Sequence, residues 1–205
     1  MKLTWLGHAC FVLEEDGYRI VADPYLRVEG YPQMHTQAHM YTCSHQHLDH
    51  FGPERVELLE GRKNPFTIRT VPTFHDPQGG ALRGTNTIHI YEAGGVRAAH
   101  LGDLGHLLTE EQAEAIGPLD AVMIPVGGYY TIDAAAAKAV CEQLRPRAIV
   151  PMHYHHGPYG LSNVGGVEDF LALWGGADIH RLDTNTLDLT ADKRGVWVPQ
   201  FLPPK

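Results

Sequence analysis

The stretch SHQHLDH at residues 44–50 constrains this chain more than any other segment, because it places three histidines and an aspartate within seven positions. Burying an imidazole without a partner is costly, and burying an ionised carboxylate costs more, so such a segment does not belong in an apolar core. Metal ions give these side chains a partner, since imidazole and carboxylate are common ligands of zinc and related metals. The stretch therefore indicates half of a two-metal site.

The spacing inside the stretch divides its ligands between two ions. His45 and His47 point the same way on an extended chain, so both can bind one ion. Asp49 continues this alternation, whereas the turn that follows it directs His50 elsewhere. A turning loop of this kind can supply ligands to two ions that lie a few ångströms apart.

Three more candidate ligands each follow an apolar, strand-like stretch: His75, Asp103 and His153. Functional side chains collect on the loops at one edge of a sheet, so we expect these residues to meet the 44–50 stretch at a common rim. His100 competes with His75 for this role, but it lies within a predicted strand and is interpreted as a partner inside the sheet.

The order of the predicted elements indicates the fold class. Strand-like segments occupy residues 2–7, 9–15, 18–24, 39–44, 66–75, 85–93, 96–103, 120–126 and 147–156, with late strand material at 179–190. Predicted helices occupy residues 52–61, 109–117, 132–146 and 168–176. Strand pairs followed by strands that alternate with helices predict an α/β sandwich with helices outside two sheets. We expect one domain over residues 1–205, because no shift in composition, linker or repeat divides the chain.

Composition argues against several classes of protein. The formal net charge of -8 disfavours a nucleic-acid binder, because such proteins present basic surfaces. No run of about 18 apolar residues is present, so neither a membrane span nor a membrane partner is expected. The three cysteines are widely spaced and odd in number, which predicts a cytoplasmic protein rather than a disulfide framework.

An ordered set of motifs resembles the metallo-β-lactamase fold superfamily. The set comprises ADP at Asp23, HQHLDH, the lone His75, GD at Asp103 and the late His153. Further segments resemble the compact branch related to L-ascorbate-6-phosphate lactonase and other metal-dependent hydrolases: TWLGHACFVLE, DPQGGALRGTN, HLGDLGHLLTEEQ and IPVGGYYTIDA. The resemblance implies a four-layer αββα sandwich with two mixed β-sheets flanked by helices.

The same resemblance implies a ligand set. One ion is held by His45, His47 and His75, and the second by Asp49, His50 and His153. Asp103 bridges the two ions, and Asp23 supports the histidine loop from outside the ligand shell. Zinc is the first choice of metal, while manganese, iron and nickel are compatible with these donors.

Such a site predicts a hydrolase. In such a hydrolase, a hydroxide that bridges the ions would attack an ester, lactone or phosphoester bond. The expected substrate is a small molecule, which can be anionic. Asp49 and Asp103 act in catalysis through the metals, and His106 is a candidate proton donor, with a structural role as its alternative. Arg83 and Asn86 are candidates for gripping an anionic substrate, and Tyr130 for shaping the pocket.

The sequence leaves open the roles of several other residues and more than one alternative function. Ser44 beside His45 suggests a nucleophile and its base, but neighbours on a strand point apart, so we expect Ser44 to be dispensable. His8 is expected to bond the backbone, and the sequence assigns no role to His35, His39, His155 and His156. The alternatives to a small-molecule hydrolase are a phosphodiesterase or nuclease on the same fold, a metal-binding sensor without turnover, and a di-iron oxidoreductase. A homo-oligomer is compatible with the sequence, which identifies no interface.

Overall fold

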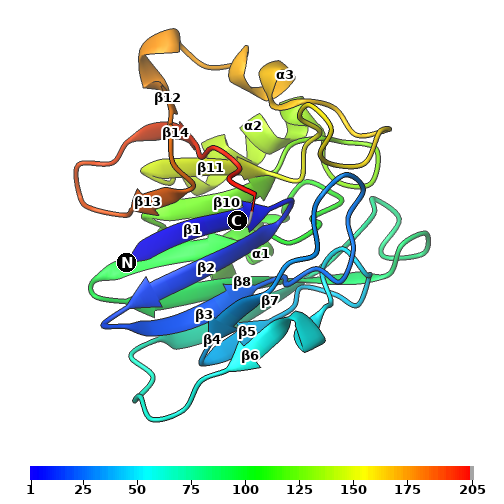
Figure 1. The fold of residues 1–205 in the computed structure, drawn as a ribbon. Helices are drawn as coiled ribbons and strands as arrows, with labels where there is room; N and C mark the ends of the chain where they lie inside the picture. Colours follow the sequence, from blue (N-terminus) through cyan, green and yellow to red (C-terminus); the bar gives the residue numbers. More distant parts are fainter. Residues whose placement is uncertain (204–205) are drawn as a thin grey trace.

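The computed structural model describes residues 1–203 and contains two large β-sheets that pack face to face around an apolar core. Figure 1 shows strands β1–β3 in front of β8–β10, with α1 and α2 behind the second sheet. The predicted α/β sandwich with two mixed sheets is confirmed, although its helices are few and short. Within the described residues, no helix is long and apolar enough to cross a membrane.

The first sheet has five strands and opens the chain. Their spatial order is β13 (Thr186–Asp188), β1 (Lys2–Gly7), β2 (Cys10–Glu15), β3 (Tyr18–Ala22) and β5 (Met40–Thr42). In β1, alternate residues are buried, so Leu3 and Trp5 face the core while Lys2 and Thr4 face outward. β1 and β3 are both antiparallel to β2, and β5 is parallel to β3, so β1, β3 and β5 run in one direction.

The second sheet has seven strands. Their spatial order is β12 (Ile179–Arg181), β14 (Gly195–Val198), β11 (Ala148–Met152), β10 (Ala121–Pro125), β9 (Val96–His100), β8 (Thr85–Ala93) and β7 (Thr67–Phe74). Every residue of β10 and β11 is buried, as expected for central parallel strands that are covered on both faces. The sequence did not indicate β14, which joins β12 to β11 by parallel pairing.

The predicted helix over residues 52–61 is wrong. A single 3-10 turn, η1 (Pro53–Arg55), is followed by strand β6 (Val56–Leu58), which pairs in parallel with β4 (Thr36–Ala38). Val56 is buried on this small sheet, while Glu57 and Leu58 are exposed. Pairing with β4 satisfies the backbone of β6, so the tertiary contact overrides the local helix propensity of the segment.

The other three predicted helices are present, although the one predicted over residues 168–176 ends at Leu171. They are α1 (Glu110–Ile116), α2 (Ala134–Leu144) and α3 (Val167–Leu171), and a 3-10 turn, η2 (Gly176–Asp178), follows. Thr109 and Gln112 form the predicted capping box at the start of α1. The side chain of Asp133 caps α2 by accepting a hydrogen bond from the backbone of Ala136.

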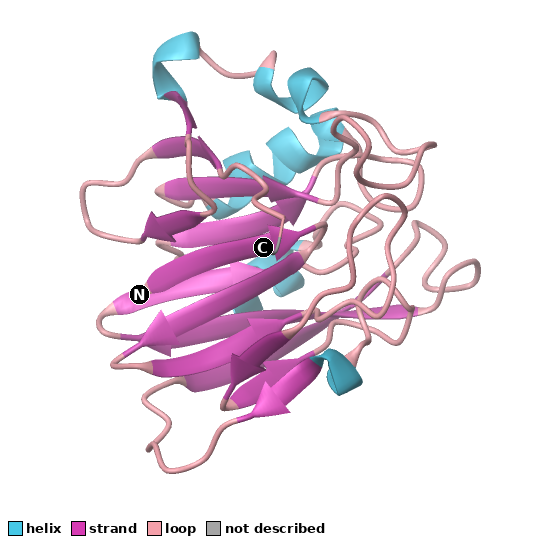
Figure 2. Cartoon of the chain, in the orientation of Figure 1, coloured by secondary structure: helices cyan, strands magenta, loops and turns pink. Residues whose placement is uncertain are grey.

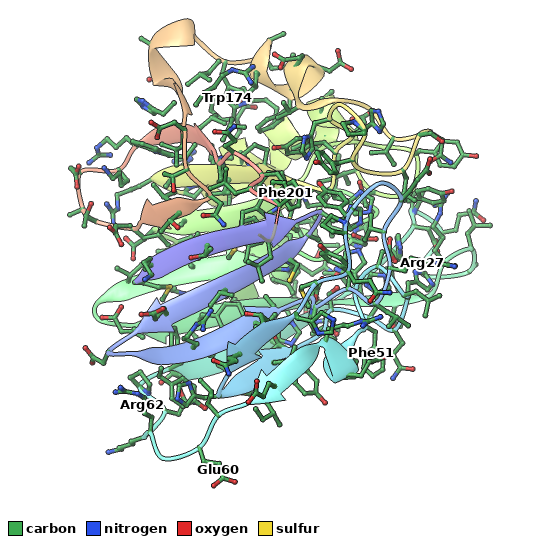
Figure 3. The ribbon with its side chains drawn as sticks, in the orientation of Figure 1. Arg27, Phe51, Glu60, Arg62, Trp174 and Phe201 are labelled. Carbon is green, nitrogen blue, oxygen red and sulfur yellow. The ribbon has the colours of Figure 1, made fainter. Side chains whose placement is uncertain are left out.

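One edge of the sandwich collects the loops. β9, β10 and β11 are parallel, and β7 runs with them because both β7 and β9 are antiparallel to β8. Figure 2 shows loops gathered at the right of the view, beyond the ends of these strands. Phe51, which directly follows the 44–50 stretch, also lies on that side, whereas Arg62 lies at the opposite end (Figure 3). The loops that follow these strands therefore lie at a common edge of the sheet, as the sequence predicts.

Candidate metal centre

Side chains from six strand ends converge at this rim. They follow the carboxyl ends of β1, β3, β5, β7, β9 and β11. Two groups of candidate ligands form there, each with its ligand atoms within 4.8 Å of one another: a first group of His45, His47 and His75, and a second group of His8, Asp49, His50 and His153. Asp103 forms a further, overlapping group with His45 and His50, so all seven ligands proposed from the sequence are brought together, and His8 joins them.

Asp103 lies between the two groups. Its Oδ2 is 3.1 Å from Nε2 of His75 in the first group and 3.4 Å from Nε2 of His153 in the second. Its Oδ1 is 3.0 Å from Nε2 of His50. One carboxylate therefore faces both groups, which is the position that a bridging ligand requires.

The donor atoms fit metal binding better than hydrogen bonding to one another. Nε2 of His45, His50 and His153 and Oδ1 of Asp103 are buried without a hydrogen-bond partner. His50 Nε2 and Asp103 Oδ1 are close enough to bond, yet both lack the alignment that a hydrogen bond needs. Ligand atoms that share one ion at about 2.1 Å lie about 3.0–3.4 Å apart, and the spacings from Asp103 to His50, His75 and His153 match that range, while its spacing to Nε2 of His45 is 3.7 Å.

Asp23 anchors the histidine loop from behind. Its Oδ1 accepts a hydrogen bond of 2.7 Å from the backbone N–H of Ser44, and its Oδ2 accepts one of 2.6 Å from Nδ1 of His50. With Nδ1 protonated, Nε2 of His50 keeps its lone pair for the centre. Asp23 is 1% exposed and holds a backbone φ of 47°, which non-glycine residues seldom adopt.

Ser44 extends this support to a second ligand. Its Oγ donates a hydrogen bond of 2.6 Å to Oδ2 of Asp23 and lies 2.9 Å from Nδ1 of His45, from which it can accept one. The expectation that Ser44 and His45 point apart is therefore wrong, because the chain turns after β5 instead of staying extended. The contact orients His45, and Ser44 is 3% exposed, with its hydroxyl bonded to Asp23.

Three carboxylates dominate the electrostatics around His50. Burial acts to lower the pKa of His50, but Asp103, Asp49 and Asp23 outweigh it and raise that pKa well above the usual value. Burial acts to raise the pKa of Asp103, but His153 and His50 outweigh it and lower that pKa. In the protein without metal, the three carboxylates therefore favour the protonated form of His50.

A cavity of about 310 Å³ opens over the two groups. Its lining comprises His47, Asp49, His75, Leu82, Arg83, Asp103, Tyr130 and Leu161. Arg83 and Tyr130, two of the predicted substrate residues, thus border the candidate ligands. Nη2 of Arg83 donates a hydrogen bond of 3.0 Å to the backbone oxygen of Tyr129, and its guanidinium carbon lies 5.7 Å from the centroid of the Tyr130 ring.

Two residues predicted for the pocket lie elsewhere. Asn86 is 1% exposed; its Nδ2 donates to Thr73 Oγ1 and to the Leu101 oxygen, and its Oδ1 accepts from the backbone N–H of Asp103. It positions Asp103 and does not face the cavity, because its amide makes three internal hydrogen bonds.

His106 is the second of these residues. Its Nε2 accepts a hydrogen bond from the backbone N–H of Phe74, and its Nδ1 donates to the oxygen of Leu107. Both ring nitrogens are therefore engaged with the backbone, which corresponds to the structural role weighed for His106. It is not part of the cavity lining.

The other histidines have local partners. His100 lies inside the sheet as expected, with Nε2 2.7 Å from the backbone oxygen of Ala9. The four histidines without a predicted role bond or contact nearby groups: His35 lies near Arg55, His39 accepts from the Arg19 backbone, His155 lies near the Gly160 oxygen, and His156 bonds the Tyr31 hydroxyl.

Asp76 is a residue of the site that the sequence interpretation missed. It is fully buried, and its carboxylate accepts backbone hydrogen bonds from Gln78, Gly80, Leu82 and Arg83. One side chain thus closes the loop that presents Arg83 to the cavity. An aspartate followed by Pro77 and a pair of glycines is a turn signal that could have indicated this role.

The fold and this site define a class of protein. Residues 2–153 match the family model described as a beta-lactamase superfamily domain, so the chain belongs to the metallo-β-lactamase superfamily. The resemblance seen in the sequence is confirmed. At the level of the family, the expectation of a metal-dependent hydrolase is confirmed as well.

Two relatives of this chain are described as metal-dependent or Zn-dependent hydrolases. A protein of Carboxydothermus hydrogenoformans named a UPF0173 metal-dependent hydrolase is 29% identical over 82% of this chain and 91% of its own length. A Thermotoga maritima crystal structure, described as a candidate Zn-dependent hydrolase of the metallo-beta-lactamase superfamily, is 37% identical, with a TM-score of 0.77 over 97% of both chains. An isothiocyanate hydrolase from Delia radicum gut bacteria shares the fold, at 14% identity and a TM-score of 0.64 over 98% of this chain and 97% of its own.

Proposed function

We propose that the protein is a dinuclear-metal hydrolase that cleaves an ester, lactone or phosphoester bond in a small substrate. The position of Asp103 carries the proposal, because its two carboxylate oxygens face both groups of candidate ligands. The buried, unpartnered nitrogens of His45, His50 and His153 support it, since a metal ion would supply the partner that they lack.

His45, His47 and His75 would hold one ion, and Asp49, His50 and His153 the other, with Asp103 shared. Two such ions would lower the pKa of water enough to give a nucleophile near neutral pH and would stabilise negative charge that develops on the substrate. Zinc is the metal we favour, because it suits imidazole-rich sites and the Thermotoga maritima relative is described as a candidate Zn-dependent hydrolase.

The chain's own residues prepare this centre. The hydrogen bonds from His50 to Asp23 and between His45 and Ser44 fix which nitrogen of each ring faces inward. Asn86 fixes the backbone from which Asp103 extends. These contacts hold the ligands in place before a substrate arrives, so little reorganisation is needed during the reaction.

The residues that line the cavity favour an anionic substrate. Arg83 borders the candidate ligands and retains donors beyond the one bonded to Tyr129, so its guanidinium can pair with a phosphate or carboxylate. Leu82 and Leu161 provide an apolar side to the same cavity. His47 and Arg83 also line a second cavity of about 540 Å³, so the site has ample room for a small molecule. Cytoplasmic location and self-association stay predictions from the sequence.

Metal analysis combined with an activity screen tests the proposal. Protein purified without added metal should contain up to two ions per chain, and it should hydrolyse at least one compound in a panel of lactones, thioesters, phosphomonoesters and phosphodiesters. A chelator should abolish that activity, and the added metal should restore it. His45→Ala should be inactive even at saturating metal, and Asp103→Asn should bind less metal.

The alternatives predict different results. A sensor without turnover would bind metal but fail the entire panel, whereas a nuclease would cleave phosphodiesters in nucleic acid and spare the small compounds. An oxidoreductase would contain iron and consume oxygen. Full activity of His45→Ala would exclude the mechanism proposed here.

A further inference from the structure

His8 lies in the two-residue turn between β1 and β2, at the same rim as the candidate ligands. We propose that His8 is an additional metal ligand, which joins Asp49, His50 and His153 around the second ion. The inference rests on the proposed function, which it deepens by making the two metal sites unequal.

The side chain of His8 is buried without a partner. It is 1% exposed, and neither Nδ1 nor Nε2 has a hydrogen-bond partner. A neutral imidazole has one donor and one acceptor to satisfy, and buried polar groups are nearly always paired. An unpaired imidazole at this depth therefore needs a partner such as a metal ion.

The His8 ring is directed at the second group. Its Nε2 lies 3.4 Å from Oδ2 of Asp49, and the candidate ligand atoms of His8, Asp49, His50 and His153 all lie within 4.8 Å of one another. The ring centroids of His8 and His153 are 4.1 Å apart. Neighbouring ligand atoms of a five-coordinate zinc ion lie about 3.0–3.6 Å apart, whereas a hydrogen bond to a carboxylate is typically about 2.7–2.9 Å long. The distance from His8 to Asp49 matches shared ligation better.

The backbone at His8 does not explain why its side chain is an imidazole. His8 has a φ of 53°, a conformation that a tight hairpin turn commonly requires and that glycine or asparagine adopts most easily. Histidine tolerates this conformation better than most other residues do, but it is not required there. The turn itself needs only the backbone of this residue, whose oxygen accepts hydrogen bonds from Trp5 Nε1 and from the backbone of His153. Since the turn does not need an imidazole, the metal centre is the remaining reason for one.

The consequence is an asymmetric centre. The second ion would have four protein donors besides Asp103, and His8, His50 and His153 are almost fully buried. The first ion would have three, of which His47 is exposed and lines the cavity together with His75. The second ion would therefore bind more tightly and stay in the protein, while the first ion keeps the open positions at which a substrate can bind.

Substitutions that keep the turn test the inference. Glycine and asparagine both tolerate the positive φ, so His8→Gly and His8→Asn remove the imidazole with the least strain on the backbone. His35→Asn is the matched control, because His35 is exposed and outside both groups. Competition with a chelator measures the dissociation constants of the two ions, and absorption spectra of the Co²⁺ protein report the coordination number. These readouts do not depend on activity.

We expect the wild type and His35→Asn to bind two ions with different affinities. Both His8 variants should lose affinity for the tighter ion by at least about tenfold, with an altered Co²⁺ spectrum, and added imidazole should restore the spectrum of His8→Gly. Wild-type affinities and spectra in both variants would overturn the inference while leaving the proposed function intact. Weaker binding with an unchanged spectrum would overturn it too, since it would show that His8 only positions Asp49.

The wild-type protein provides a measurement that is independent of any variant. Nuclear magnetic resonance of the ¹¹³Cd²⁺ protein with ¹⁵N-labelled histidine should show coupling through the metal–nitrogen bond at six imidazoles, from the six histidines of the two groups. Coupling at the other five without coupling at His8 would exclude His8 as a ligand. Failure of the wild type to bind metal at all would overturn the proposed function itself, so the two failures are distinguishable.

Discussion

Oδ2 of Asp23 lies 2.6 Å from Nδ1 of His50, and this contact joins the end of β3 to the candidate metal centre. The same carboxylate also binds the backbone and hydroxyl of Ser44. A residue that makes no direct contact with the proposed ions thus sets the orientation of the loop that supplies four of their ligands.

Asp23→Asn should therefore weaken metal binding without removing a ligand. The amide presents one acceptor where the carboxylate presents two, so the contacts to His50 and Ser44 cannot all survive. We expect metal affinity to fall roughly 10–100-fold, with activity recovering at saturating metal. Chelator competition measures the loss. Asp16→Asn, the same change in an exposed hairpin turn, is the control. Unaltered affinity in Asp23→Asn would contradict the anchoring role.

Ser44→Ala separates an orienting serine from a nucleophilic one. The hydroxyl bonds Asp23 and lies within hydrogen-bond distance of His45, so its loss should loosen the His45 ring and weaken metal binding about several-fold. At saturating metal, most of the hydrolytic activity should return, because the proposed reaction needs no protein nucleophile. Steady-state kinetics at increasing metal concentration check this. Complete inactivity at every concentration would instead indicate attack by Ser44.

The site was predictable from the sequence where strand ends supply its ligands. His75, Asp103 and His153 follow apolar strands, and the parallel course of β7, β9 and β11 brings them to one edge. The same rule applies to His8, which follows β1, but a histidine in a hairpin turn was interpreted as a backbone contact. Its burial without a hydrogen-bond partner, visible only in the structure, identifies it as a candidate ligand.

The direction of individual side chains was not predictable. Asn86 lies one residue into β8, and only its pairing with β7 and β9 turns it inward, toward Thr73 and Asp103. The prediction of a helix over 52–61 was wrong for a related reason. β6 forms there by parallel pairing with β4, and local sequence does not show pairing between segments that are separated in the chain. Local sequence patterns predicted the elements whose signals lie within the element itself, such as α1, which begins with the capping box at Thr109.

Asp76→Ala should impair substrate binding through Arg83. Without the carboxylate, four backbone N–H groups of the loop lose their acceptor, and Arg83 is no longer held at the cavity. For an anionic substrate, we expect KM to rise about tenfold or more, as in Arg83→Ala, while KM for a neutral substrate changes less.

Metal analysis provides the control for this variant, because Asp76 neighbours His75 in the sequence. The metal content of Asp76→Ala should equal that of the wild type. Loss of metal together with an unchanged KM would show that Asp76 supports the ligand, not the substrate loop.

Metal binding should release protons, because the carboxylates around His50 favour its protonated form in the metal-free protein. Asp103, Asp49 and Asp23 overcome the effect of burial and raise the pKa of His50. A group whose pKa is raised on folding stabilises the folded protein fully below its unfolded pKa, near about 6.5, and loses that contribution as the pH rises through the folded pKa. The contribution of His50 to the stability of the metal-free protein thus falls with rising pH across this window, whereas a metal ion that replaces the proton is bound more tightly.

Two measurements check this linkage. Calorimetric titration with Zn²⁺ in buffers of different ionisation enthalpy, at about pH 7, should show release of at least one proton per chain. The rise in Tm on adding Zn²⁺ should be larger at about pH 8 than at about pH 6, since protons compete with the metal at the lower pH. His50→Gln should remove most of the proton release. If Zn²⁺ binds the wild type without releasing protons and with the same affinity at both pH values, His50 is not a ligand that must lose its proton.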